Sequence, residues 1–209
     1  MGLTSLFLDM KDKNVLIVGT GSVGIRRGRR FLDTGANVSV VTKDINNDIK
    51  EEFIEKGAVF YDNSHLDELI DKCDLVVAAT SNHELNKEIS IKAKDKLVNC
   101  ASDISLSNVI VPSTFNIGSV TVSLYTGSKS PLMAKQLRKK IQSVITEEDI
   151  MNIELQEHIR TLLKKKIEQP EDRKEYLTQL YHDEHVQELI KENNIVEAKE
   201  YVNTIIKKL

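Results

Sequence analysis

The chain has few cysteines, no tryptophan and no long apolar run. Its only thiols, Cys73 and Cys100, are far apart and form no CxxC pair. This spacing argues against a disulfide scaffold and against a cysteine-rich zinc site. Each thiol flanks an apolar run, so we expect both to be small core residues.

No apolar run approaches the roughly 20 residues that a helix needs to cross a bilayer. The first residues, MGLTSLFLDMKDK, also lack the basic start and the longer apolar stretch of a signal peptide. We therefore expect a cytoplasmic protein without a membrane segment.

Charge is distributed unevenly along a chain whose net charge is −3. Residues 1–146 carry 19 Lys and Arg against 17 Asp and Glu, whereas residues 147–209 carry 10 against 15. The change near residue 146 indicates a boundary between two parts of different composition.

Short β-branched runs alternate with amphipathic segments in the first half of the chain. The five predicted strands are Val15–Val18, Val38–Thr42, Ala58–Tyr61, Leu75–Ala79 and Leu97–Ala101. The predicted helices between them cover residues 22–34, 46–56, 65–72 and 82–94. This alternation predicts right-handed βαβ units, and therefore an α/β fold with a Rossmann-type parallel sheet covered by helices.

The alternation ends after the fifth strand. Val109–Val111 and Ser119–Tyr125 are predicted to be strands without a helix between them, and Asn116-Ile117-Gly118 is predicted to be a tight connection. Ser130 and Pro131 are then expected to begin a helix, because serine caps free N–H groups and proline suits the first turn.

From that helix to Leu209 the pattern is helical, and breaks at Pro170 and Asn193-Asn194 predict about three segments. The sequence thus predicts a Rossmann domain over residues 1–112, a strand-plus-helix region over 113–146 and a helical C-terminal domain over 147–209.

A glycine loop, Gly19-x-Gly21-x-x-Gly24, lies between the first predicted strand and the first predicted helix. In a dinucleotide-binding loop the first glycine permits the tight turn, the second lets the backbone approach a pyrophosphate, and the third packs the helix closely on the strand. The N–H groups of Ser22, Val23 and Gly24 would then hold the phosphate. The alternative is a glycine-rich turn that binds no ligand.

Residues after the second and fourth predicted strands complete the expected cofactor site. Asp44 lies 20 residues after the last glycine and just past Thr42, where such folds place an acid on the ribose. We expect NAD on this basis, although the neighbouring Lys43 would tolerate the 2′-phosphate of NADP. Ala79 and Thr80 are small and leave room for ribose and nicotinamide.

Two basic clusters occur in an otherwise acidic chain. They consist of Arg26, Arg27, Arg29 and Arg30 in the first, and of Lys129, Lys135, Arg138, Lys139 and Lys140 in the second. Charge runs are commonly solvated helix faces, but two such clusters together favour an anionic ligand. Phenylalanine and tyrosine are scarce near both clusters, which argues against nucleic acid as that ligand.

Four segments are specific in combination. They are LFLDMKDKNVLIVGTGSVGIRRGRRFLDTGANVSVV, LVVAATSNHELN, LVNCASD and VIVPSTFNIGSVTVSLYTGSKSPLMAKQLRKKI. Together they resemble the siroheme synthase N-terminal family of precorrin-2 dehydrogenases and sirohydrochlorin ferrochelatases. The resemblance implies NAD-dependent oxidation of precorrin-2 to sirohydrochlorin, to which some members add iron insertion. It also implies a homodimer, with the residues after about 112 forming the intersubunit region.

Precorrin-2 carries eight carboxylates, so a protein that binds it needs clusters of lysine and arginine. The resemblance therefore assigns to tetrapyrrole binding the residues Arg26, Arg27, Arg30, Thr126, Ser128, Lys129, Ser130, Lys135 and Arg138.

Members of this family place an aspartate, as general base, shortly after the asparagine that ends the fifth strand. The counterpart of that asparagine is Asn99, and some members have the aspartate at the position of Ser102. The resemblance thus points to the next residue, Asp103, as the base, with Ser102 as its helper. Asp103 is the only acid between Asp95 and Glu147. The alternative is that it caps the following turn.

His182-Asp183-Glu184-His185 is the one tract with metal-ligand character, with two histidines three residues apart on a predicted helix. We expect a solvated helix face there and no resident metal. Whether the protein also inserts a metal into its product stays open. The rival to an enzyme is a non-catalytic NAD(H)-binding module that senses redox state, which would bind NAD(H) without consuming precorrin-2.

Overall fold

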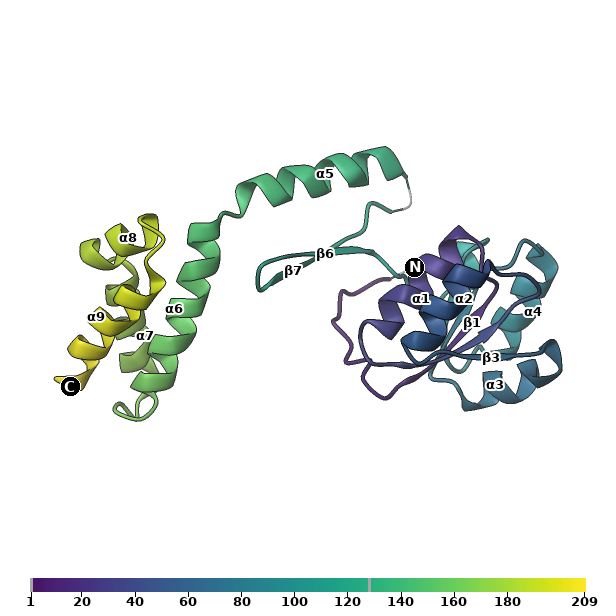
Figure 1. Cartoon of the computed structure of the whole chain (residues 1–209), viewed down its shortest axis with the longest axis horizontal. Helices are drawn as coiled ribbons and strands as arrows, with labels where there is room; N and C mark the ends of the chain where they lie inside the picture. Colours follow the sequence, from purple (N-terminus) through teal and green to yellow (C-terminus); the bar gives the residue numbers. More distant parts are fainter. Residues whose placement is uncertain (1, 128) are drawn as a thin grey trace. The chain divides into compact units, whose positions relative to one another are not determined.

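Five short parallel strands form the sheet of the N-terminal part (Figure 1). They are β1 (Asn14–Val18), β2 (Asn37–Val41), β3 (Val59–Tyr61), β4 (Leu75–Ala78) and β5 (Leu97–Cys100), in the order β3-β2-β1-β4-β5. In the central strand, Ile17 pairs with Val40 on one side and with Val77 on the other. The five predicted strands are confirmed to within one residue at each end.

The structure is a computed structural model that describes residues 2–127 and 129–209. The chain divides into two compact units, Met1–Val111 and Pro112–Leu209. The further division of the second unit at residue 146 stays a prediction.

Helices cover both faces of the sheet. They are α1 (Ser22–Leu32), α2 (Asn47–Glu55), α3 (Leu66–Lys72) and α4 (His83–Lys92). One apolar core joins α1 and α2 to one face of the sheet, and a second core joins α3 and α4 to the other face. The Rossmann-type α/β fold predicted from the alternating pattern is therefore confirmed.

Strand β1 shows why these strands are almost wholly apolar. Val15 and Ile17 belong to the core under α1 and α2, whereas Leu16 and Val18 belong to the core under α3 and α4. All four side chains are buried, and burial of each contributes about 1.5–3 kcal/mol. Because a parallel sheet is covered on both faces, no position of β1 after its first residue is left for a polar side chain.

The strand order creates a switch point between β1 and β4. The chain runs from β1 outward through β2 to β3 and then returns to β4 on the other side of β1. The loops that follow β1 and β4 therefore leave the carboxyl edge in opposite directions and leave a crevice between them. The glycine loop and Ala79-Thr80 lie at this crevice.

The predicted strand Val109–Val111 is wrong. Both Asn108 N and Val109 N donate to Val98 O, and Asn99 Nδ2 donates to Val109 O. This segment therefore contacts β5 through one side-chain hydrogen bond and through two backbone bonds that share the acceptor Val98 O. Within the described chain it forms no ladder of backbone hydrogen bonds with β5 and is not a strand.

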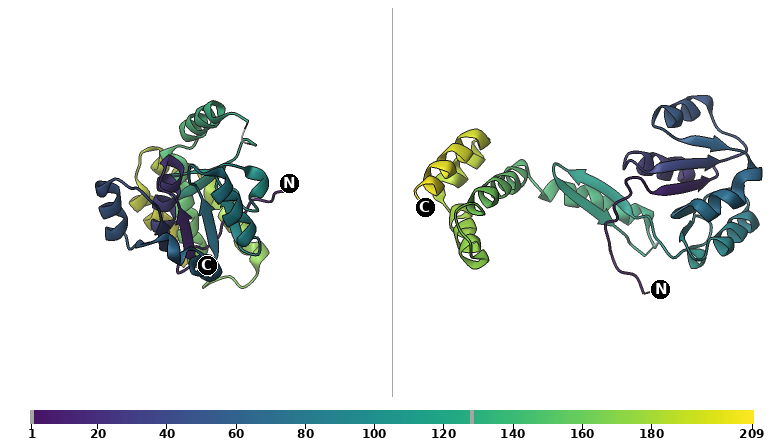
Figure 2. Two further views of the ribbon diagram at one scale, coloured as in Figure 1. Left: turned by 90° about the vertical axis from the view of Figure 1, so that its right-hand side faces the viewer. Right: turned by 90° about the horizontal axis from the view of Figure 1, so that it is seen from below.

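The antiparallel hairpin differs from the prediction, because Asn116 and Ile117, which were expected in the tight connection, belong to its first strand. Its strands are β6 (Ser113–Ile117) and β7 (Val120–Leu124), which pair from Ile117↔Val120 to Ser113↔Leu124 (Figure 2). The turn consists of Gly118 and Ser119, and Gly118 has a φ of +52°, which glycine adopts without strain. The predicted strand at Ser119–Tyr125 is confirmed as β7.

Five helices follow the hairpin. They are α5 (Pro131–Val144), α6 (Glu147–Leu163), α7 (Pro170–Tyr181), α8 (Glu184–Lys191) and α9 (Ile195–Lys207). Ser130 caps α5 and Pro131 begins it, as predicted. The breaks at Pro170 and Asn193-Asn194 are also confirmed.

Two breaks were missing from the predicted three segments. Thr146 and Asp149 form a capping box that begins α6, and Asp183 caps α8 by accepting a hydrogen bond from Val186 N. Both caps are short polar side chains within helical stretches, where they compete with the helix for backbone N–H groups. Helices α6 to α9 enclose an apolar core of their own (Figure 2).

Candidate functional site

A cavity of about 380 Å³ opens at the carboxyl edge of the sheet. Six of the residues predicted to bind the cofactor line it: Gly19, Gly21, Thr42, Asp44, Ala79 and Thr80. The loops after β1, β2 and β4 are thus brought together as the sequence predicts. Asn63, Asn82 and Leu85 also line the cavity and were not predicted, because no motif marks their positions.

Gly19 and Gly24 are required by the protein's own packing. Gly19 has a φ of +92°, and a Cβ there would lie 2.7 Å from Ala79 O. A Cβ on Gly24 would lie 1.9 Å from Gly19 O. No side chain fits at either position, so the predicted tight turn and close helix packing are confirmed.

Gly21 differs from these two glycines because the protein leaves space beside it. A Cβ there would meet only Ala79 O, at 4.0 Å. Gly21 is also the N-cap of α1 and supplies no side chain to cap the helix. The first N–H groups of α1, on Ser22, Val23 and Gly24, are therefore available to an anion in front of Gly21. This open, positively polarised position suits the pyrophosphate of a dinucleotide.

Two threonines hold the loop that follows β2. The Thr20 and Thr42 hydroxyl oxygens lie 2.7 Å apart, and each lies within 3.1 Å of Asp44 O. These bonds fix the backbone of Asp44 at the cavity, with its side chain exposed. A carboxylate at this position accepts hydrogen bonds from ribose hydroxyls. Thr20 was not predicted because the glycine-loop motif does not specify which residue types occupy its x positions.

Asp103 and Ser102 follow β5 at the same edge of the sheet. Asp103 Oδ1 accepts hydrogen bonds from Ser105 Oγ at 2.7 Å and from Ser105 N at 2.8 Å. These two bonds lower the pKa of Asp103, so its carboxylate is ionised at neutral pH. Asp103 thus caps the turn Ile104–Leu106, while its Oδ2 makes no hydrogen bond to any described residue.

The four arginines of α1 have different environments. Arg29 forms a bidentate ion pair with Glu52, with Nη2 2.6 Å from Oε2 and Nε 2.9 Å from Oε1. Arg27 is half-buried, and its buried Nη1 finds no hydrogen-bond partner in the described part of the chain. Burial, and after it the charge of Arg26, lowers the pKa of Arg27 to about 10. Burial also lowers the pKa of Arg30.

Arg26 and Arg29 are therefore exposed arginines of this cluster, and Arg29 is paired with Glu52. Arg27 stays protonated at neutral pH, and its buried Nη1 has no acceptor among the described residues. A buried cationic donor of this kind is costly unless an anion pairs with it, so Arg27 is the arginine best suited to a ligand carboxylate.

The second basic cluster lies in the other unit. Lys129, Lys135 and Arg138 are exposed, and the Arg138 guanidinium lies 4.9 Å from the centre of the Phe115 ring. Ser130 Oγ accepts from Met133 N and is thus committed to capping α5. Thr126 precedes it in the loop after β7, and Ser128 lies outside the described residues.

The histidine tract does not lie on one helix, which corrects that expectation. His182 is the C-cap of α7 and Asp183 is the N-cap of α8, so a helix boundary separates the two histidines. Within residues 2–127 and 129–209, no three His, Cys, Asp or Glu side chains are grouped so that they could hold a metal ion.

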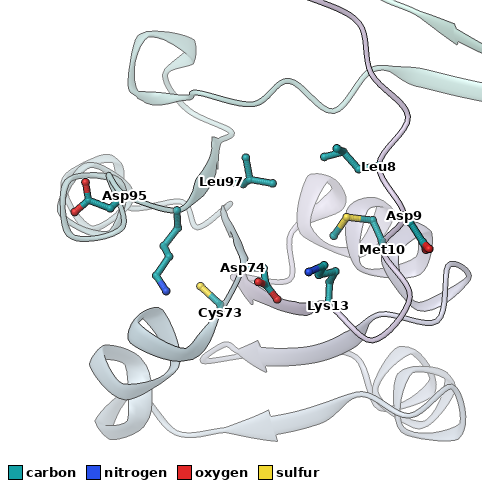
Figure 3. A pocket seen from close by; sticks show the side chains of 9 residues that line it. Leu8, Asp9, Met10, Lys13, Cys73, Asp74, Asp95 and Leu97 are labelled. Atoms are coloured by element: carbon teal, nitrogen blue, oxygen red, sulfur yellow. The ribbon is translucent and has the colours of Figure 1, made fainter.

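A second cavity, of about 420 Å³, opens at the amino edge of the sheet (Figure 3). Its lining includes Lys13, Asp74 and Cys73. Asp74 Oδ2 already accepts a hydrogen bond from Asn14 N at 2.8 Å, and burial raises the pKa of the Cys73 thiol to about 11. This cavity lies away from the switch point and holds no activated nucleophile. Both cysteines are buried, as predicted.

Across the described residues, no helix is long and apolar enough to cross a membrane.

Comparison with known proteins extends these observations. Residues 6–113 match the family described as "Putative NAD(P)-binding". The chain is 33% identical to the precorrin-2 dehydrogenase of Bacillus subtilis over 67% of this chain and 87% of the relative. It is 29% identical to the precorrin-2 dehydrogenase of Methanosarcina barkeri over 87% of this chain and 84% of the relative. The solved structure of SirC, a precorrin-2 dehydrogenase, superposes with a TM-score of 0.77 and 25% identity, covering 99% of this chain and all of that one.

Proposed function

Because the chain belongs to the precorrin-2 dehydrogenase family, we propose that it oxidises precorrin-2 to sirohydrochlorin with NAD, as a step of siroheme synthesis. The cavity at the switch point is the observation that carries this proposal. It joins a glycine loop, an exposed acid and two small residues at one edge of the sheet. NAD supplies the acceptor for the hydride that the macrocycle loses.

The residues around the cavity suit each part of the dinucleotide. The N–H groups of Ser22, Val23 and Gly24 bind the pyrophosphate, and Asp44 binds the adenosine ribose. Ala79 and Thr80 border the space for the nicotinamide end. Asp44 favours NAD over NADP, because a carboxylate repels a 2′-phosphate.

Oxidation of the macrocycle removes one hydride and one proton from neighbouring atoms, and a carbon–carbon double bond forms between them. We assign the proton to Asp103, whose carboxylate is ionised and whose Oδ2 is available to accept it. The C–H bond that loses its proton to Asp103 leaves its electron pair behind, and this pair forms the new π bond. The neighbouring C–H bond breaks with its electron pair leaving as part of the hydride. Ser102, next to Asp103, donates a hydrogen bond to the substrate.

Carboxylates of the tetrapyrrole pair with the two basic clusters. In the first cluster the contact is the half-buried Arg27, whose guanidinium stays protonated at neutral pH, and Arg26 and Arg30 add positive charge around it. In the second, the contacts are Thr126, Ser128, Lys129, Ser130, Lys135 and Arg138.

We further propose that residues 113–146 form the interface of a homodimer. Helix α5 has no buried residue within the described chain, and its Leu132 and Val144 side chains are each 66% exposed. Such apolar side chains on one helix indicate a surface covered in the assembled protein. The cytoplasmic location expected from the sequence stays a prediction.

Incubation of the purified protein with precorrin-2 tests this function. With NAD, the absorption spectrum of sirohydrochlorin should appear, and without NAD it should not. Binding of NAD without loss of precorrin-2 would instead identify a redox-sensing module. Addition of ferrous iron to the product then measures metal insertion, through loss of the sirohydrochlorin spectrum.

A further inference from the structure

Asn86 is a fully buried asparagine inside α4, with an exposed fraction of 0%. Its side-chain amide makes four hydrogen bonds. Oδ1 accepts from Thr80 Oγ1 at 2.7 Å and from Thr80 N at 3.0 Å. Nδ2 donates to Thr80 O at 3.0 Å and to Ser102 Oγ at 3.1 Å. The hydrogen-bonding groups of the amide are thus all occupied, and only two residues, Thr80 and Ser102, supply the partners.

Packing alone does not explain an amide at this position. Asparagine is a poor helix former because its side chain competes for backbone groups, and a buried amide is costly unless it is fully bonded. Ile89, one turn later on α4, is also buried, and an apolar side chain of this kind fills a core position without that cost. The four hydrogen bonds therefore indicate that Asn86 holds something in place.

Asn86 connects two loops that the sheet alone would leave separate. Thr80 follows β4 and lines the 380 Å³ cavity. Ser102 follows β5 and lies beside Asp103, outside the lining of that cavity. We infer that Asn86 is a positioning residue whose single amide couples the cofactor-side loop at Thr80 to the Ser102–Asp103 loop. The role of this coupling in catalysis rests on the proposed function. Its effect on NAD affinity does not depend on that function.

The backbone of Thr80 fixes the orientation of the amide. A backbone N–H only donates and a backbone oxygen only accepts, so Oδ1 must face Thr80 N and Nδ2 must face Thr80 O. Nδ2 consequently faces Ser102, and Ser102 Oγ is the acceptor of that bond. The hydroxyl hydrogen of Ser102 then points elsewhere, toward Cys100 Sγ at 3.4 Å or toward a ligand. Asn86 thereby leaves the Ser102 hydroxyl free to donate to one of these two partners.

The coupling is tested through NAD affinity, measured by calorimetric titration without tetrapyrrole. Ser102→Ala removes only the far end of the link, at a residue that does not line the cofactor cavity. We expect it to weaken NAD binding about threefold, within the range that coupled networks transmit. In an Asn86→Leu background, Ser102→Ala should change NAD affinity no further. Asn86→Ala provides a second background if Asn86→Leu does not fold.

Ser90→Ala is the matched control. Ser90 Oγ donates to Asn86 O at 2.7 Å and also hydrogen-bonds the Cys100 thiol, so this variant removes buried hydrogen bonds of α4 and β5 without removing any bond of the amide. It should lower the melting temperature and leave NAD affinity unchanged. An unchanged NAD affinity in Ser102→Ala, or an equal effect of that substitution with and without Asn86, overturns the coupling. Failure of the proposed function appears separately, as wild-type protein that binds NAD but does not consume precorrin-2.

Discussion

The hydroxyl oxygens of Thr20 and Thr42 lie 2.7 Å apart, and both reach the backbone oxygen of Asp44. One threonine comes from the glycine loop and the other from the end of β2, so their contact joins two of the loops that line the cavity. The position of the proposed ribose-binding acid therefore depends on a residue of the glycine loop that no motif marks.

Thr20→Val tests that dependence. The valine keeps the branched shape but loses the hydroxyl, and one lost hydrogen bond of about 1 kcal/mol weakens NAD binding by roughly fivefold. Thr20→Ser keeps the hydroxyl and should retain wild-type affinity in the same titration. Equal losses in the two variants would mean that the methyl group, and not the hydroxyl, holds the loop.

Substitutions of two glycines in the glycine loop should affect NAD binding and stability separately. Gly21→Asp places a negative side chain in open space, where the pyrophosphate is proposed to lie, so it should abolish NAD binding at an unchanged melting temperature. Gly24→Ala drives a Cβ into Gly19 O and should lower stability by about 3 kcal/mol. Normal NAD affinity in folded Gly21→Asp contradicts the assigned phosphate position.

Much of this arrangement follows from the sequence, and the exceptions have physical reasons. The strands are predictable because burial on both faces demands continuous apolar runs. Val109–Val111 has the same composition but lies on β5 through the side chains of Asn99 and Asn108, which composition does not reveal. Asn86 was missed because a lone polar residue within a helical pattern resembles any solvated position.

Sequence patterns also did not separate the arginines of α1 from one another. The spacing identifies a cluster, but only the fold pairs Arg29 with Glu52 and leaves Arg27 Nη1 buried without a described partner. The capping role of Asp103 was the stated alternative to catalysis, and the bonds to Ser105 confirm the cap. The catalytic role stays a prediction, since one oxygen can cap while the other accepts a proton.

Arg27→Met should separate stability from substrate binding. Removing a half-buried cation whose Nη1 has no acceptor among the described residues should raise the stability of the free protein by on the order of 1 kcal/mol. It should also raise the KM for precorrin-2 and leave the KM for NAD unchanged. Arg29→Met is the matched control, because Arg29 is paired with Glu52, and it should leave the KM for precorrin-2 unchanged. A KM for precorrin-2 that rises equally in both variants would indicate a general effect of charge.

Salt tests the basic clusters together. Exposed charges are screened within about 8 Å at physiological ionic strength, so added salt should raise the KM for precorrin-2 far more than that for NAD. If salt raises the KM for both substrates equally, the basic clusters are solvated helix faces and do not bind the tetrapyrrole.

Asp103→Asn tests the proposed base. The amide keeps the cap on Ser105 N but does not accept a proton, so kcat should fall by roughly 10²-fold or more with near-normal binding of both substrates. Ser102→Ala should lose far less in kcat. Full turnover in Asp103→Asn would place the base elsewhere.

The pH dependence of kcat follows from the same carboxylate. Its hydrogen bonds to Ser105 hold the pKa of Asp103 below the usual value, so the base form persists above that pKa and is lost only as pH falls through it. The acid limb of the wild-type profile should lie below the ordinary range of an aspartate. Ser105→Ala removes the hydroxyl bond that contributes most to the shift and should move this limb to higher pH.

Leu132→Asp tests the proposed dimer. A charge in an apolar interface is costly, so the variant should be a monomer by light scattering when the wild type is a dimer. Ile91→Asp, at an exposed isoleucine of α4, is the control and should keep the wild-type mass. Unchanged mass in Leu132→Asp would remove α5 from the interface.

The most direct measurement is the stoichiometry of the reaction, with NADH and sirohydrochlorin followed together in one sample of purified protein, precorrin-2 and NAD. We predict one NADH for each sirohydrochlorin formed, with neither product in Gly21→Asp and a strongly slowed appearance of both in Asp103→Asn. Sirohydrochlorin formed without NADH, or NAD bound while precorrin-2 persists, would contradict an NAD-dependent precorrin-2 dehydrogenase.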